Sequence, residues 1–123
     1  MSITFYAAFE ESKNCWSYLP HVETVNVSNS NGYALIRELQ FTAEDGGMAP
    51  VCIDTFMSRC TAALRNRMRT PDLGIPLTES RGAGGATFFD CGRPDGYLQD
   101  RVMELLALAR DGKAGGATHV YAA

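Results

Sequence analysis

Four consecutive polar residues, Ser28, Asn29, Ser30 and Asn31, separate a strand-like segment from a helix-like one. Short hydroxyl and amide side chains accept hydrogen bonds from the free N–H groups of a first helical turn, so either serine suits the N-cap. The same N–H groups and the positive end of the helix dipole favour a bound phosphate or carboxylate. Capping alone explains these residue types, and anion binding by Ser28, Asn29 and Asn31 is the alternative that we carry forward.

Two arginines in a long irregular segment are candidates for the same ligand. Residues 70–96 contain three prolines and a glycine cluster at 82–85. Loops of this length are often lids or binding loops, although a disordered loop fits the composition as well. The cluster does not open a helix and no Lys-Ser/Thr follows it, so it does not fit a phosphate loop. We predict that Arg81 and Arg93 contribute to a site for an anion.

The chemistry-bearing residues also allow a catalytic hypothesis. A small hydrolase or transferase acting on a phosphorylated or nucleotide substrate would use Asp90 or His119 as general base and Arg81 or Arg93 to stabilise developing charge. A nucleophile pair formed by Cys91 and His119 is also open, but no spacing selects it. We therefore assign no catalytic residue.

The cysteines and histidines do not form a recognisable metal-binding motif. Zinc sites usually contain close ligand pairs, and the candidates here are scattered along the chain. Cys52 and Cys60 are expected to be small core hydrophobes. We predict neither a metal nor another cofactor. The six candidates are Cys15, His21, Cys52, Cys60, Cys91 and His119.

Composition limits the classes of partner. The 123 residues carry 11 Lys and Arg against 14 Asp and Glu, and the net charge of −3 argues against nucleic-acid binding. No run approaches the roughly 18 apolar residues of a membrane span, and the N-terminus lacks the basic region of a signal peptide. We expect a cytoplasmic protein without a membrane or nucleic-acid partner.

Four short segments are predicted to be strands. Residues 3–9 and 24–27 alternate apolar and polar side chains, as a half-buried strand does. Residues 86–89 and 118–121 are rich in β-branched and aromatic residues, which favour strands. The aromatic segment 15–20 has no clear period and is expected to form either a loop folded back over the core or an exposed contact surface.

Three apolar stripes predict three helices. The first follows the polar run, the second has Pro50 in its first turn, and the third has Asp95 as N-cap and ends near Gly112. The arginines near the end of the second helix match the negative end of its dipole, which outweighs an anion site as an explanation. The second stripe consists of Ile53, Phe56, Met57, Cys60, Ala63, Leu64 and Met68, the third of Leu98, Val102, Leu105, Leu106 and Ala109, and the arginines are Arg59, Arg65, Arg67 and Arg69.

These elements predict an α+β fold, with a small mixed β-sheet and three helices packed mainly on one face. The length fits a single globular domain over residues 1–123, with a long irregular loop at about 70–96.

The segment from Val25 to Ile36 resembles the signature of small bacterial and phage proteins in which a "VN-x-SN-x-N" turn precedes a helix. The resemblance extends to the glycine before the second helix, to the Gly-Tyr-Leu at 96–98 and to the closing strand. It departs at Ala122 and Ala123, where a glycine is expected, and around Trp16. It implies a small accessory protein of a bacterium or phage, and no catalytic residues or established activity come with it.

The leading hypothesis is a non-catalytic binding protein that sequesters an anionic, nucleotide-like small molecule or inhibits a host protein. The polar helix start and the arginine-bearing loop would together form the ligand pocket. The alternatives are the enzyme described above and a structural interaction module whose apolar helices extend into a homo-oligomer interface.

Overall fold

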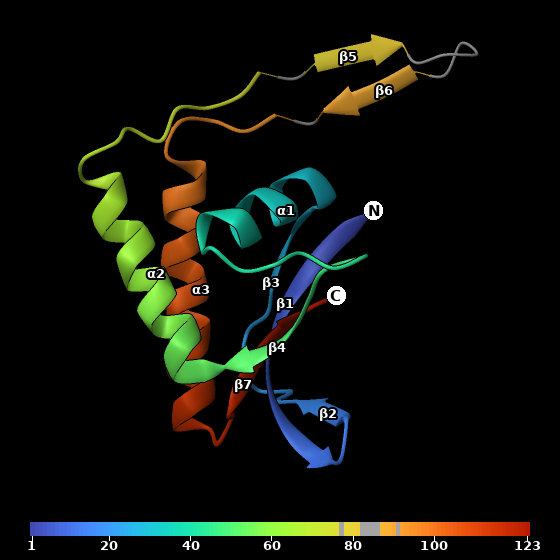
Figure 1. Cartoon of the computed structure of the whole chain (residues 1–123), viewed down its shortest axis with the longest axis vertical. Helices are drawn as coiled ribbons and strands as arrows, with labels where there is room; N and C mark the ends of the chain where they lie inside the picture. The colour runs from blue at the N-terminus through green and yellow to red at the C-terminus, as the bar shows by residue number, and fades with distance from the viewer. Residues whose placement is uncertain (77, 82–86, 91) are drawn as a thin grey trace.

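A computed structural model describes the backbone of residues 1–76, 78–81, 87–90 and 92–123, and side chains for 1–76 and 92–123. Seven strands and three helices are assigned in these ranges (Figure 1). In chain order they are β1 (Ser2–Ser12), β2 (Cys15–Tyr18), β3 (Val25–Ser28), α1 (Asn29–Glu38), β4 (Met48–Cys52), α2 (Ile53–Arg67), β5 (Thr78–Arg81), β6 (Thr87–Asp90), α3 (Tyr97–Ala114) and β7 (His119–Ala122).

Five strands form the main sheet, with β1 at its centre. β7 pairs with residues 5–8 of β1 and carries β4 at its other edge. β3 and β2 pair with the first and second halves of the opposite edge of β1. All four pairings are antiparallel, so the α+β prediction is confirmed, while the described sheet is antiparallel rather than mixed.

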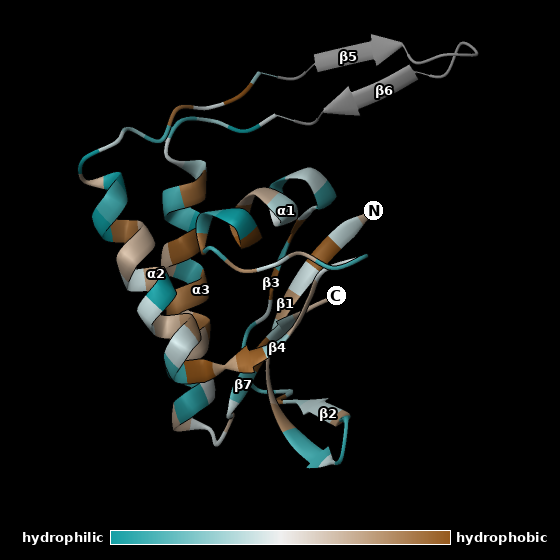
Figure 2. Cartoon of the chain, viewed as in Figure 1, coloured by the Kyte–Doolittle hydropathy of each residue, from teal (hydrophilic) through white to brown (hydrophobic). Residues whose placement is uncertain are grey.

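The three helices cover one face of this sheet (Figure 1). Side chains alternate along β1, and Ile3, Phe5 and Ala7 point into the core with at most 3% of their surface exposed. Figure 2 shows hydrophobic residues along α2, α3 and the strands, and hydrophilic residues at the C-terminal end of α2 and in the turn after β1. The alternating pattern read from residues 3–9 therefore identifies the buried face correctly.

The polar run forms the start of α1, as the sequence predicts. Ser28 is the N-cap, and its Oγ accepts a hydrogen bond from the backbone N–H of Asn31 at 3.4 Å. Leu35 and Ile36 are fully buried on the core side. Gly32 allows the helix to lie close to β1, because a Cβ at this position would be 2.7 Å from Ile3 Cδ1.

The second helix begins later than the sequence predicts. Pro50 lies in β4 rather than in the first turn of a helix, and α2 starts at Ile53 with Cys52 as its N-cap. A proline is tolerated there because β4 is an edge strand, and its register with β7 shifts between Met48 and Val51. Cys52 is exposed, so its predicted place in the core is wrong.

Two further local predictions differ from the structure. Residues 15–18 form strand β2 on the edge of β1, where the sequence suggested a loop. The N-cap of α3 is Gly96, in a left-handed conformation, and not Asp95. Asp95 instead accepts a hydrogen bond from the backbone N–H of Gly74 at 2.6 Å, which ties the two ends of the 74–95 segment together.

The 70–96 segment contains a hairpin. β5 and β6 pair antiparallel in a separate two-stranded sheet, and Figure 1 shows them beyond the ends of α2 and α3. Strand β6 overlaps the strand predicted at 86–89. At the base of the segment, Ile75 and Arg93 exchange backbone hydrogen bonds of 2.8 and 2.7 Å.

The buried thiol of Cys60 gives a testable pH dependence. Burial raises its pKa from 9.0 to about 12, so the unfolded chain loses this proton before the folded protein does. The contribution of this thiol to stability is therefore complete below pH 9 and falls as the pH rises from 9 towards 12. Between pH 8 and pH 10 we expect the free energy of unfolding of the wild type to fall by about 1.4 kcal/mol more than that of Cys60→Ala. Urea denaturation at both pH values measures this difference, and parallel pH profiles for the two proteins would contradict it.

Candidate functional site

A polar pocket of about 360 Å³ lies between the C-terminal ends of α1 and α2. Its lining combines three arginines with one glutamate, two amides and a hydroxyl group. The residues are Arg37, Glu38, Gln40, Asn66, Arg67, Arg69 and Thr70. We call this cavity the arginine pocket.

Arg59, near the middle of α2, ties this helix to the backbone that follows α1. Its Nη1 donates to the backbone carbonyls of Leu39, at 3.4 Å, and Gln40, at 2.9 Å. Its guanidinium carbon also lies 5.2 Å from the ring centroid of Phe41. Because Arg59 lies on α2 and its partners follow α1, these contacts fix the spacing of the pocket walls.

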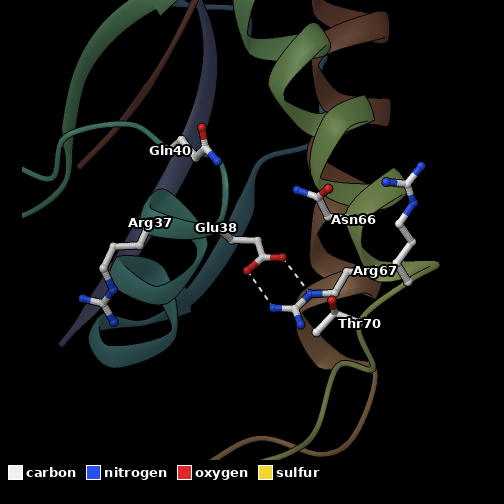
Figure 3. Close-up of a pocket in the computed structure, with 7 residues that line it drawn as sticks. Arg37, Glu38, Gln40, Asn66, Arg67 and Thr70 are labelled. Atoms are coloured by element: carbon white, nitrogen blue, oxygen red, sulfur yellow. Dashed lines mark hydrogen bonds and ion pairs between the residues drawn. The ribbon is translucent and has the colours of Figure 1, made fainter.

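An ion pair between Arg67 and Glu38 crosses the pocket. Arg67 Nε and Nη2 donate to the two carboxylate oxygens of Glu38, both at 2.7 Å, and about four-fifths of each side chain is buried. Figure 3 shows the two side chains reaching toward each other from α2 and α1. The hydrogen bonds to Glu38 raise the pKa of Arg67 above its usual value. Arg67 is therefore a fixed positive group at the pocket wall.

The other two arginines of the pocket are not engaged in this way. Arg37 and Arg69 make no hydrogen bond or ion pair with any residue in the described ranges, and the Arg37 side chain points away from the ion pair in Figure 3. Arg37 lies in the last turn of α1, and Arg69 follows α2. Both positive charges therefore also interact favourably with the negative end of a helix dipole. Three arginines and one glutamate give the lining a formal charge of +2, which suits an anionic ligand.

The site predicted from the sequence lies at the other end of α1, and the structure brings two of its residues together. Asn31 is 5% exposed, and its Nδ2 donates to the backbone carbonyl of Gly92 at 3.3 Å. Its Oδ1 accepts a hydrogen bond from Arg93 Nη1 at 3.5 Å. Asn31 and Arg93 are thus neighbours although 62 positions separate them in the chain.

The remaining predicted site residues are placed less completely. Ser28 caps α1 and Asn29 is its first residue. Arg81 ends β5, but its side chain lies outside the described part of the structure, as does that of Asp90. The Nε atom of Arg93 is buried and finds no hydrogen-bond partner among the described residues. The binding role of the predicted site stays a prediction; its residues are Ser28, Asn29, Asn31, Arg81 and Arg93.

The comparisons with known proteins identify no relative. No family model, no curated protein and no solved structure matches this chain. The assignment of a function therefore rests on the residues themselves.

The candidates for catalysis lie elsewhere in the fold. His119 is on β7, with its ring 4.6 Å from that of Trp16 and its Nδ1 2.8 Å from Thr118 Oγ1. Cys91, its proposed nucleophile partner, lies outside the described residues. Where side chains are described, no three His, Cys, Asp or Glu residues gather in an arrangement that could hold a metal ion. None of the described helices combines the length and apolar composition needed to cross a bilayer.

The sequence does not indicate the arginine pocket, because the helix dipole by itself explains the arginines at the end of α2. No sequence pattern selects Arg37 and Glu38 as neighbours of that basic end. The signal that could have found the pocket is a carboxylate in the last turn of α1 opposite the basic end of α2. That signal becomes visible only when the two helix ends are known to be adjacent.

Proposed function

We propose that this protein is a non-catalytic binding protein that sequesters a small anionic ligand of the nucleotide type, holding its phosphate in the arginine pocket. The observation that carries this proposal is a pocket lined by three arginines and one glutamate, in which Arg37 and Arg69 have no hydrogen-bond or ion-pair partner in the described ranges. Guanidinium groups bind phosphate through two parallel hydrogen bonds, and these are among the stronger hydrogen bonds in proteins.

The size and polarity of the pocket support the same ligand class. A volume of about 360 Å³ lies at the lower end of the range for small-molecule sites, which is about 300–1,000 Å³. Asn66 and Gln40 offer amide donors and acceptors, and Thr70 offers a hydroxyl group, next to the arginines. Such groups fix the orientation of a bound phosphate ester after the arginines have supplied most of the attraction.

The lack of a free general base in the pocket supports sequestration over turnover. Among the described lining residues the one carboxylate is Glu38, and Arg67 occupies both of its oxygens. A general base has to be within hydrogen-bond reach of the proton that it removes, and Glu38 is committed to another partner.

The pocket predicts the response of binding to arginine substitution. We expect Arg37→Ala and Arg69→Ala each to weaken binding of a nucleoside phosphate about tenfold, because each removes a charge-assisted contact worth about 1.4 kcal/mol. Native mass spectrometry with a panel of nucleoside mono-, di- and triphosphates identifies the bound compound, and isothermal titration calorimetry measures its affinity. Lys13→Ala, which removes the same charge in the turn after β1, is the control and should bind as the wild type does.

The same experiment separates the alternatives. After denaturation the released ligand should have an unchanged mass, and an altered mass would favour the enzyme hypothesis instead. If Arg93→Gln abolishes binding while Arg37→Ala and Arg69→Ala do not, the ligand binds at the start of α1. If none of the nucleotides or inorganic phosphate binds to the wild type, the proposal is wrong.

A further inference from the structure

A second surface, unrelated to the arginine pocket, lies along the seam between α2 and α3. It is a mainly apolar groove of about 380 Å³ on the solvent side of the two helices. Its lining residues are Thr61, Leu64, Arg65, Met68, Gln99 and Met103. We call it the methionine groove.

Two residues of the groove are large hydrophobic side chains that are exposed to solvent. Met68 is 86% exposed and Met103 is 54% exposed, although both lie beside a well-packed helix pair. Leu73, which follows α2, is 71% exposed. Contiguous apolar patches on soluble proteins often mark interaction sites, and methionine side chains adapt readily to a partner surface.

The two sides of the groove carry opposite charges. On the α2 side Arg65 lies at the rim. On the α3 side the exposed position one helical turn before Met103 is Asp100. Neither Arg65 nor Asp100 forms an ion pair with another residue in the described ranges.

We propose that the methionine groove is a self-complementary interface that binds a second copy of this chain. A two-fold axis parallel to the helices places α2 of one copy over α3 of the other. Arg65 of each copy then faces Asp100 of the other copy, and the methionines of both copies meet in the middle. The result is a four-helix arrangement in which the surfaces complement each other in both charge and apolar character.

The register of α2 and α3 supports this arrangement. Lys113 Nζ lies 2.6 Å from Asp54 Oδ1 at one end of the antiparallel helix pair, and Met68 and Gln99 line the groove together near the other end. Arg65 therefore lies at nearly the same height along the pair as residues 100–104. Rotation about the two-fold axis keeps that height, so it brings Arg65 close to Asp100 of the second copy.

The size of the surface is that of a small protein–protein interface. α2 has 15 residues and is about 22 Å long, and two helices side by side are about 20 Å wide. The two copies would bury on the order of 1,000 Å² in total, which is the lower end for a specific interface. We therefore expect a dimer that forms in the micromolar range.

Sedimentation velocity from 1 to 200 µM tests the interface. The wild type should shift from monomer to dimer as the concentration rises. Arg65→Glu should weaken dimerisation at least tenfold, because the new carboxylate would lie opposite the carboxylate of Asp100 in the other copy. Asp100→Arg should weaken it for the converse reason. The double variant with both changes should regain most of the lost affinity, because the exchanged charges again face each other across the two-fold axis.

Two controls separate the interface from general effects of charge and folding. Thr55→Glu adds a carboxylate to an exposed position of α2 far from Arg65, and Lys13→Glu makes the same charge change as Arg65→Glu at a distant turn. Both should dimerise as the wild type does, and circular dichroism checks that every variant is folded. A wild type that stays monomeric at 200 µM, or a dimer that Arg65→Glu and Met103→Glu leave intact, would overturn the proposal. If the wild type is monomeric, the partner that fits the groove is instead an amphipathic helix of another protein.

Discussion

Phe56→Ala is expected to lower the free energy of unfolding by about 3–5 kcal/mol, a large part of the stability of a protein of this size. Phe56 lies on α2 and is fully buried. Its ring stacks on that of Phe41, with the centroids 5.9 Å apart and the planes at 4°. Alanine would lose the transfer free energy of the ring and leave a cavity between α2 and the segment that follows α1. Urea denaturation of the wild type and the variant measures the loss.

A double-mutant cycle with Phe41→Ala shows how much of this loss comes from the ring pair. Phe41 is only partly buried, so its own substitution should cost less than that of Phe56. We expect a coupling energy of about 0.5–1.5 kcal/mol, since aromatic pairs contribute that much beyond their buried area. Phe56→Leu, which keeps most of the volume, should lose less than half as much stability as Phe56→Ala. An equal loss from both variants would mean that cavity formation is not the cause.

Sequence patterns predicted well those features of the fold that are determined within a single helix or strand. The apolar stripe of α3 is buried at all five positions that the sequence indicated, from Leu98 to Ala109. The stripe of α2 is buried at Ile53, Phe56, Cys60 and Ala63, but it ends at an exposed Met68. Periodicity identifies which residues share a helix face. It does not show how far along that face another element continues to cover them.

Two strands that the sequence did not predict were missed for different reasons. β4 is a strand because it pairs with β7, about 70 positions away, and this pairing overrides the preference of Pro50 for a first helical turn. That partner is not visible in a local window of the sequence. β2, in contrast, forms a hairpin with the end of β1, and a register shift between Glu10 and Ser12 interrupts the alternation that would have indicated it.

The candidate sites show the same limit. The cap at Ser28 is a local feature and was predicted correctly, whereas the meeting of Asn31 with Arg93 requires the 70–96 segment to return to the start of α1. The arginine pocket requires the ends of two helices to be adjacent, and Arg59 contributes by tying α2 to the backbone that follows α1. Residue types alone identified some side chains of the candidate sites. They did not indicate which of these side chains lie close together in the fold.

Gly112→Val is expected to destabilise the protein by about 3 kcal/mol, because α3 lies against β1 with no room for a side chain. A Cβ at Gly112 would be 2.5 Å from Ala7 Cβ, well inside van der Waals contact, and 3.6 Å from Ile53 Cδ1. A glycine inside a helix costs about 1 kcal/mol relative to alanine, so removing it would stabilise α3 if space allowed. The clash is with the Cβ of a central strand, which cannot move aside as a flexible side chain would, and so it outweighs that gain. Thermal or urea unfolding measures the net effect.

A reciprocal exchange tests whether the close approach is the cause. Gly112→Ala should be destabilising by itself, and Ala7→Gly in the same chain should restore much of the loss, because it removes the atom that the new Cβ meets. Ala114→Val places the same β-branched residue at an exposed position near the end of α3 and should cost less than about 1 kcal/mol, which reflects helix propensity alone. If Gly112→Val and Ala114→Val were equally stable, or if Ala7→Gly did not rescue Gly112→Ala, the distance between α3 and β1 would not be what requires glycine at this position.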